Sequence, residues 1–167
     1  MHDELTSVDL QKLRDELEYR ETELMPRILE DVKTARSFGD LSENYEYKAA
    51  KDEQRKNMRR IRYLKQMIAS AVVIDAASDE GVAGLFDTVR LFMEDDNEEM
   101  TVRFVTTLRQ NALEGLISKE SPLGRAVLGH RVGERVRVSV SDDYGYWVEI
   151  RAIEKGTDDD TLEISAY

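Results

Sequence analysis

The sequence contains no cysteine, which excludes disulfide bonds and metal sites built on thiolates. Its two histidines, His2 and His130, lie far apart along the chain and suggest no metal site either. No apolar run is long enough to span a bilayer, and the acidic N-terminus lacks the apolar segment of a signal peptide. The glycines between residues 115 and 133 lack the Gly-Lys-Ser/Thr ending of a phosphate-binding loop. We therefore expect a cytoplasmic protein with no membrane association.

Charge is what the sequence has in abundance. Charged residues make up 35% of the 167 residues, and the net charge of −11 argues against binding duplex nucleic acid over the whole surface. The charge is unevenly distributed, because residues 44–71 contain 8 basic residues and only 3 acidic ones. The length allows one medium domain or two small domains.

Two long helical patterns occupy the first half of the chain. In the first, over about Val8–Arg36, apolar residues recur at spacings of three, four and seven, and Pro26 should kink or restart the helix. In the second, over about Asn44–Ala71, two heptad series form a coiled-coil seam that two amides weaken. Because the connection at Phe38–Leu41 is short, the helices must run antiparallel. The first half therefore predicts a helical hairpin.

Strand patterns dominate the second half. After a small, polar stretch over residues 77–84, β-branched and aromatic residues recur in four segments, with a final edge strand expected around residues 162–164. The four segments are Thr88–Met93, Met100–Thr106, Arg135–Val140 and Tyr146–Ile153. We predict an α+β protein with an antiparallel coiled coil over residues 1–76, a linker over 77–84, and an antiparallel β domain over 85–167.

One short helix is expected inside the β domain. Ser121 is a favoured N-cap residue, and Pro122 suits the first helical position because its missing N–H is not needed there. Gly129 would end this helix.

The stretch Gly39-Asp40-Leu41-Ser42-Glu43-Asn44-Tyr45-Glu46-Tyr47 forms the end of the expected hairpin. Asp40 and Glu43 lie three residues apart, so both carboxylates face one side of a helical first turn. In one interpretation Asp40 is the N-cap and Glu43, at position N3, completes a capping box. In the other, the two carboxylates bind Mg²⁺, and because two ligands are too few for tight binding, a partner molecule shares the ion. The two interpretations are compatible.

Basic residues recur at steps of three and four along the second helical pattern, on one face. We call this set the basic stripe; it consists of Lys48, Lys51, Arg55, Arg59 and Arg62. It is either a solvated face that pairs with carboxylates of the first helix, or a track for a phosphate backbone. Tyr45 and Tyr47, at the hairpin end of the stripe, could stack on a base.

The hairpin-end residues Gly39-Asp40-Leu41-x-Glu43-Asn44-x-Glu46-Tyr47 resemble those of the bacterial Gre transcript-cleavage factors, which assist RNA polymerase. Pro26, Ala35-Arg36 and Ala49-Ala50 match as well, and the match resumes at Ser121-Pro122-x-x-Arg125-x-x-x-Gly129. The resemblance implies a coiled coil that enters the secondary channel of the polymerase. It also implies a C-terminal domain of FKBP-like fold that docks at the rim of this channel.

The resemblance also implies roles for individual residues. Asp40 and Glu43 match the acidic pair that helps to hold the second Mg²⁺ of the polymerase active site, so this chain alone should bind no metal tightly. Arg36 and Lys51 match basic positions near the transcript. Together with Lys48, Arg55 and Arg59 of the basic stripe, they are the residues that we expect to contact the 3′ end of the nascent RNA. The implied polymerase-docking residues are Ser121, Pro122, Arg125 and Gly129.

The implied function is that of an elongation factor, monomeric when free, that stimulates the polymerase's own cleavage of nascent RNA in backtracked complexes. By this interpretation the chain is not itself an enzyme. The alternatives are an inhibitor of the same fold that blocks the secondary channel, a prolyl isomerase, and a coiled-coil chaperone. Both acids of the hairpin end are retained, which favours cleavage over inhibition.

Overall fold

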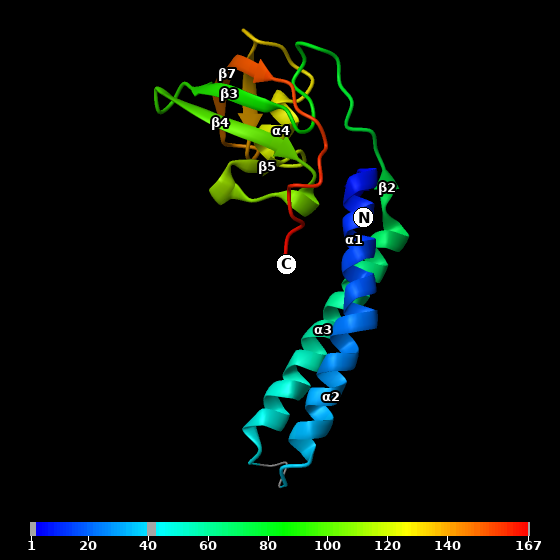
Figure 1. Ribbon diagram of the computed structural model, residues 1–167. Coiled ribbons are helices and arrows are strands. Elements are labelled where there is room, and N and C mark those ends of the chain that lie inside the picture. Colours follow the sequence, from blue (N-terminus) through cyan, green and yellow to red (C-terminus); the bar gives the residue numbers. More distant parts are fainter. Residues whose placement is uncertain (1–2, 40–42, 167) are drawn as a thin grey trace. The chain divides into compact units, whose positions relative to one another are not determined.

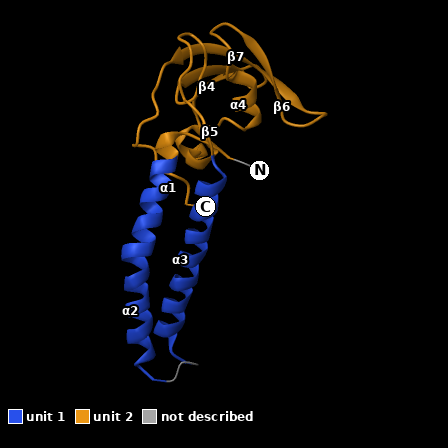
Figure 2. Ribbon diagram, turned by 90° about the vertical axis from the view of Figure 1, so that its right-hand side faces the viewer, with its two compact units in different colours: residues 1–2, 10–71 blue, residues 3–9, 72–167 orange. Residues whose placement is uncertain are grey.

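The computed structural model describes residues 3–39 and 43–166, which form two compact units (Figure 2). One unit contains residues 10–71, and the other contains residues 3–9 together with residues 72–166. The bounds expected from the sequence, 1–76, 77–84 and 85–167, differ because residues 3–9 and 72–84 lie in the second unit. The α+β fold class is confirmed, since long helices form the first unit and a β-sheet the second.

The first unit is an antiparallel helical hairpin (Figure 1). Its first arm runs through α1 (Ser7–Tyr19), a five-residue π-helical segment (Arg20–Leu24) and α2 (Met25–Arg36), and its second arm is α3 (Tyr45–Ser70). Both arms and their antiparallel course agree with the sequence prediction. Of the described helices, none combines the length and the apolar character needed to cross a membrane.

Pro26 explains the interruption of the first arm. Proline has no N–H, and its ring collides with the carbonyl group four residues earlier in an α-helix. The chain widens into the π-helical segment directly before it, where the Met25 N–H donates to the Arg20 carbonyl. Asn57 of α3 meets this segment, since its Nδ2 donates to the Arg20 carbonyl at 3.4 Å and its Oδ1 accepts from the Arg20 guanidinium at 2.9 Å. The amide expected to weaken the seam therefore bonds across it.

Apolar and polar side chains share the seam between the arms. Glu16 accepts hydrogen bonds from Arg20 at 2.7 Å and from Arg60 at 2.8 and 2.9 Å. Burial raises the pKa of Glu16, but the hydrogen bonds from Arg60 and Arg20 outweigh it and hold this pKa below its ordinary value. Because such a network is satisfied in only one alignment of the arms, it fixes which residues meet at the hairpin end. The buried apolar residues beside it include Ile28, Val32, Ala35 and Leu64.

The second unit is built on a five-stranded sheet with the strand order β5-β4-β3-β7-β6 (Figure 1). All neighbouring strands are antiparallel except β4 and β5, which are parallel. The four strands expected from the sequence are present, whereas β5 was not expected. The strands are β3 (Thr88–Met93), β4 (Glu98–Val105), β5 (Leu116–Ser118), β6 (Arg135–Ser139) and β7 (Gly145–Glu154).

Short elements complete the second unit. The expected helix is α4 (Pro122–Val127), which packs on β6 and contributes its buried Leu123 and Val127 to the core of the sheet. Two short turns of 3₁₀-helix, η2 (Thr107–Arg109) and η3 (Ala112–Glu114), connect β4 to β5. The segments before and after the hairpin meet in this unit, since β1 (Glu4–Leu5) pairs in parallel with β2 (Val72–Val73).

Two segments differ from expectation. Residues 77–84 are not a free connection, because Ala83 is buried in the core and its N–H donates to the His130 carbonyl at 2.9 Å. The expected final strand is wrong, because residues 162–166 form no strand. Leu162 packs instead against the small cluster around buried Phe86. In both cases a few apolar contacts hold the segment in place. Each segment is too short or too polar for its sequence to show the apolar periodicity of a helix or strand.

Arg109, at the end of η2, is a fully buried cation in the second unit, with 1% of its surface exposed. Its Nε lies 2.7 Å from the carboxylate of Asp9, and its guanidinium also pairs with Asp158. It donates to the Thr6 hydroxyl at 3.3 Å and stands 4.6 Å from the centre of the Phe86 ring. One cation thus joins the start of α1 and the residue before it, the C-terminal tail and the sheet domain.

Replacing Arg109 by methionine should destabilise the second unit by about 3–5 kcal/mol, because the buried carboxylate of Asp9 loses its counter-charge. Urea unfolding followed by the fluorescence of Trp147 measures this change. Arg125→Met is the control, since it removes an exposed guanidinium of the same unit and should cost no more than about 1 kcal/mol. Equal stability of the two variants would show that the buried cluster contributes no more than a surface pair.

Candidate functional site

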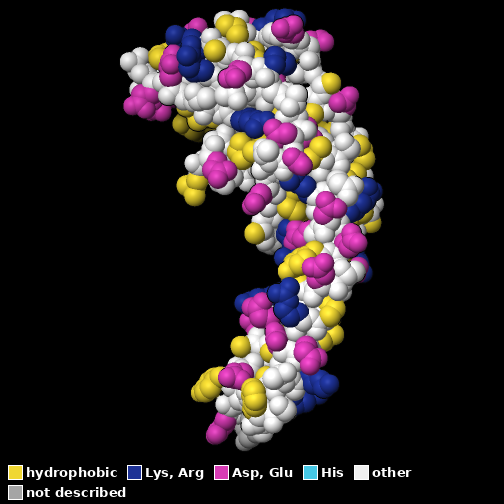
Figure 3. Space-filling model, in the orientation of Figure 1, with side chains coloured by type: hydrophobic (Ala, Val, Ile, Leu, Met, Phe, Trp, Pro, Cys, Tyr) yellow, Lys and Arg dark blue, Asp and Glu magenta, His cyan; other side chains and the backbone are white. Residues whose placement is uncertain are grey.

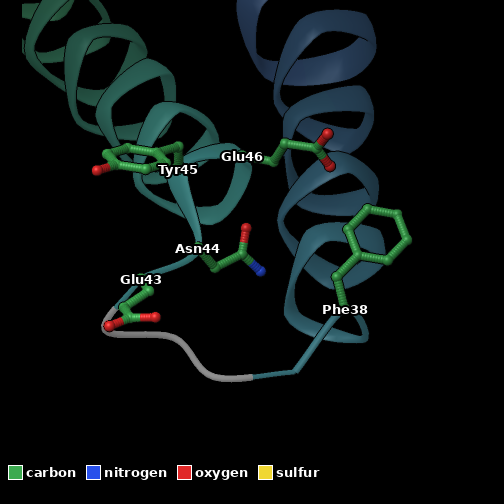
Figure 4. A pocket seen from close by; sticks show the side chains of 5 residues that line it. All are labelled: Phe38, Glu43, Asn44, Tyr45 and Glu46. Carbon is green, nitrogen blue, oxygen red and sulfur yellow. The ribbon is translucent and has the colours of Figure 1, made fainter.

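The side chain of Asn44 bonds to both helices at the end of the hairpin. Its Oδ1 accepts the Tyr47 N–H at 3.0 Å, which makes Asn44 the N-cap of α3. Its Nδ2 donates to the Ala35 carbonyl in the last turn of α2 at 2.6 Å. Figure 4 shows this amide directed from the start of α3 towards α2. The start of one helix and the end of the other are therefore held together by one amide group.

The helix α2 ends at Arg36, and Gly39 lies in the connection that follows it. Its φ of +113° is a conformation that residues with a side chain rarely adopt, so glycine is needed at this position. Asp40 lies outside the described residues. Glu43 directly precedes the N-cap, is exposed, and forms no ion pair with any residue that the structure describes.

The capping interpretation of the acidic pair is wrong. It placed Asp40 at the N-cap and Glu43 at N3, whereas the N-cap is Asn44 and Glu43 precedes the helix. The carboxylate of Glu43 is thus free of the structural role that competed with metal binding. Among residues 3–39 and 43–166, no three His, Asp or Glu side chains are grouped to hold a metal ion. A metal bound at the hairpin end would need further ligands from another molecule.

The basic stripe lies along α3 on the side that faces away from the seam. Because about 3.6 residues make one helical turn, positions 48, 55, 59 and 62 point away from buried Asn57 and Leu64. Lys48, Arg55, Arg59 and Arg62 are exposed, and Lys51 is half-buried and donates to Gln54 at 2.9 Å.

Ion pairs distinguish the stripe from its neighbours on α3. Lys65 and Arg60 pair with Glu21 and Glu16 of the first arm, and Lys56 pairs with Asp52 of its own helix. Within the described part of the chain, Arg55, Arg59 and Arg62 form no ion pair. The ion pairs expected of a solvated face are therefore formed by Lys56, Arg60 and Lys65, which flank the stripe. The charges of Arg55, Arg59 and Arg62 remain available to a ligand.

Tyr47 connects the stripe with α2. Arg36 donates to the Tyr47 hydroxyl at 3.5 Å, and its guanidinium lies 5.7 Å from the centre of the ring. This hydrogen bond, together with the positive charges of Lys51 and Arg55, lowers the pKa of Tyr47 below its ordinary value. The structure thus brings Arg36, from the first arm, to the same side of the hairpin as the stripe. Tyr45 is 81% exposed, and the centre of its ring lies 5.5 Å from the ammonium group of Lys48.

Three of the four residues matched in the second unit have local structural roles. Ser121 caps α4 by accepting the Gly124 N–H at 3.0 Å, Pro122 occupies its first turn, and Gly129 has a φ of +88° directly after it. Arg125 differs, because its side chain is 71% exposed and pairs only with Glu120 among the described residues. It is the member of this set whose charge is presented to solvent.

The roles of Asn44 and Gly124 were not expected from the sequence. The signal for Asn44 was present, because asparagine is a preferred N-cap and it stands directly before the second helical pattern. Gly124 gave no local signal, since its requirement is tertiary: a Cβ there would lie 2.5 Å from the Ser118 carbonyl oxygen.

Residues 4–73 match the family model described as transcription elongation factor, N-terminal, and residues 78–155 match the model for the C-terminal part of GreA/GreB. The chain is 39% identical over 152 residues to transcription elongation factor GreA of Oenococcus oeni, which covers 90% of this chain and 94% of that protein. It is 42% identical over 147 residues to GreA of Agrobacterium fabrum, with coverages of 87% and 92%. The crystal structure of GreA factor homolog 1 (Gfh1) of Thermus thermophilus has 27% identity and a TM-score of 0.44, with coverages of 93% and 100%.

Two substitutions separate the two hydrogen bonds of Asn44. Asn44→Ala removes both and should destabilise the hairpin by about 0.5–2 kcal/mol, as expected for the loss of an N-cap. Asn44→Asp keeps the acceptor for the Tyr47 N–H but removes the donor to Ala35. Amide hydrogen exchange should show faster exchange at Tyr47 in Asn44→Ala and near-parent exchange in Asn44→Asp. Unchanged exchange at Tyr47 in Asn44→Ala would mean that Asn44 does not cap α3 in solution.

Tyr47 should titrate below the ordinary range of tyrosine, and Arg36→Ala should raise its pKa, because a neighbouring cation stabilises the phenolate form. An NMR titration of ¹³C-labelled tyrosine rings measures this shift. Lys33→Ala is the matched control, since it removes another exposed cation of α2. If both variants move the Tyr47 pKa equally, the contact between Arg36 and Tyr47 is not formed in solution.

Proposed function

Because the chain belongs to the GreA/GreB family of transcription elongation factors, we propose that it acts on RNA polymerase by stimulating cleavage of nascent RNA in backtracked complexes. In this proposal the hairpin enters the secondary channel and carries the acidic pair to the polymerase active site. The observation that carries the proposal is the position of Glu43. It is an exposed carboxylate at the far end of a long hairpin, outside the helix, and Asn44 has already capped that helix.

The acidic pair is suited to a shared metal. Mg²⁺ prefers about six oxygen ligands and is commonly held by one or two carboxylates, with other ligands filling the remaining positions. Asp40 and Glu43 would supply those carboxylates, and the polymerase and the RNA would supply the rest. When bound, such an ion activates a water molecule and neutralises charge on the phosphate that is attacked. The chemistry would belong to the polymerase, and the chain by itself would cleave no RNA.

The basic stripe would guide the extruded 3′ end of the RNA. Lys48, Lys51, Arg55 and Arg59 line one side of α3, and Arg36 joins them from α2 through Tyr47. Contacts to phosphates raise affinity without reading the sequence, which suits a factor that meets many transcripts. Support comes from the absence of ion pairs at Arg55 and Arg59 among the described residues.

The second unit would dock the protein at the rim of the channel. Ser121, Pro122 and Gly129 shape the short helix α4, and Arg125 presents a charge beside it. We expect one copy of the chain on each polymerase and a monomer in the free state. A channel-blocking inhibitor of the same fold is the second candidate. It is not favoured, because the chain shares 39–42% identity with GreA elongation factors over most of its length.

The test uses halted elongation complexes that carry labelled RNA in the presence of Mg²⁺. The parent chain should shorten the transcript, and Asp40→Asn and Glu43→Gln should each reduce stimulation by at least about 10–100-fold, since each removes a metal ligand. Both variants should still bind polymerase and keep the amide protection of Tyr47, because neither residue caps α3. Glu30→Gln, an exposed change elsewhere on α2, is the control and should cleave like the parent.

The opposite outcome is equally specific. If the parent chain leaves the transcript intact and only slows elongation, the inhibitor is the correct function. If Glu43→Gln and Asp40→Asn both cleave like the parent, the acidic pair does not bind the metal.

A further inference from the structure

A groove between α2 and α3, close to the hairpin end, contains Glu43, but its other lining residues have no part in the function proposed above. It consists of two neighbouring parts. The part nearer the hairpin end has a volume of about 650 Å³ and is lined by Phe38, Glu43, Asn44, Tyr45 and Glu46 (Figure 4). The part farther from the hairpin end has a volume of about 400 Å³, and both parts are lined by Phe38 and Glu46. We call it the acidic groove and define it by Asp31, Phe38, Glu43, Glu46, Ala50 and Glu53.

The charge of the acidic groove is of one sign. Four carboxylates line it, and its described lining contains no lysine, arginine or histidine. Within the described part of the chain, Asp31, Glu43 and Glu46 form no ion pair, and Glu53 lies 3.6 Å from the exposed Lys56. Figure 3 shows acidic and hydrophobic side chains at the end of the hairpin, with Lys and Arg side chains to the right of them. Such a surface attracts a cation and repels a phosphate.

The groove also carries uncovered aromatic surface. The Phe38 side chain, two residues after the end of α2, is 64% exposed, although a ring of this size is normally buried. Ala49 and Ala50 are small, so the floor between the helices stays open. In Figure 4 the side chain of Glu46 extends from α3 towards α2, and Phe38 lies just after the end of α2. An aromatic ring beside several carboxylates fits a guanidinium group, whose flat face stacks on the ring while its N–H groups donate to carboxylates.

The acidic groove and the basic stripe use different sides of α3. With about 3.6 residues per turn, positions 46, 50 and 53 point towards the seam, and positions 48, 55 and 59 point away from it. RNA on the stripe therefore leaves the groove accessible. We propose that the acidic groove binds an arginine-bearing segment of RNA polymerase, so that the hairpin contacts RNA on one side and protein on the other. This inference rests on the proposed function, because it takes the polymerase to be the partner.

The test measures binding to core RNA polymerase without nucleic acid, so neither RNA contacts nor cleavage contribute. The triple variant Asp31→Asn/Glu46→Gln/Glu53→Gln keeps the shape of the groove and removes three charges. Its affinity should fall by about tenfold, the equivalent of one charge-assisted hydrogen bond. The matched control Glu18→Gln/Glu23→Gln/Glu30→Gln removes three exposed charges of the first arm outside the groove and should bind like the parent.

Equal affinity of the groove variant and the parent would overturn the inference while leaving the cleavage function intact. Conversely, a chain that binds core polymerase through the groove but cleaves nothing would retain the inference and remove the proposed function. Thermal melting of both triple variants checks that the hairpin stays folded.

The partner itself is identified by replacing Phe38 with a photo-crosslinking phenylalanine analogue in the complex with polymerase. The expected product joins residue 38 to a polymerase peptide that contains arginine. A crosslink to nascent RNA in a halted complex, or to a second copy of this chain, would overturn the inference.

Discussion

The amide of Asn44 is the contact on which the rest of the hairpin end depends. It caps α3 through Tyr47 and bonds to the last turn of α2 through Ala35, so one side chain fixes the spacing of two helix ends. A long hairpin with frayed ends would present its terminal carboxylates over a wide range of positions. A closed end presents Glu43 from a defined place, directly before the N-cap and outside the helix. Glu43 would have to meet a metal that another molecule holds. For such a ligand, a defined position matters more than the chain's own affinity for the metal.

The seam makes that contact possible by setting the register of the two arms. Pro26 forces a π-helical segment. The side chain of Asn57 bonds to this segment at Arg20, through the carbonyl and the guanidinium of Arg20. Glu16 and Arg60 add a second cross-arm pair. An apolar seam tolerates sliding, whereas these bonds are satisfied in one alignment only. The same alignment puts cations on one side of the hairpin and carboxylates on another, so the charge pattern of the surface follows from the polar residues of the seam.

Much of the fold could be predicted from the sequence because its signals are local. Periodicity gave the two arms and four strands, and the prolines marked the restart at Pro26 and the first turn of α4. Features set by tertiary contacts could not be predicted: β5 has three residues and no period of its own, and the burial of Arg109 depends on segments far apart in sequence. For the site, spacing put Asp40 and Glu43 at the hairpin end but assigned the cap to the wrong residue. Two cap candidates four residues apart, Asp40 and Asn44, have equal local propensity, and only the length of the connection decides between them.

The central claim is that the hairpin end meets the metal of the polymerase active site, and its most direct test replaces the Mg²⁺ of a halted elongation complex with Fe²⁺. When hydrogen peroxide is added, Fe²⁺ reduces it to hydroxide and a hydroxyl radical, which cuts only the protein backbone close to the iron. We expect cuts in the bound chain within residues 38–46 and none in the second unit. If the bound chain is cut only in the second unit, or is not cut at all, the hairpin end does not reach the metal.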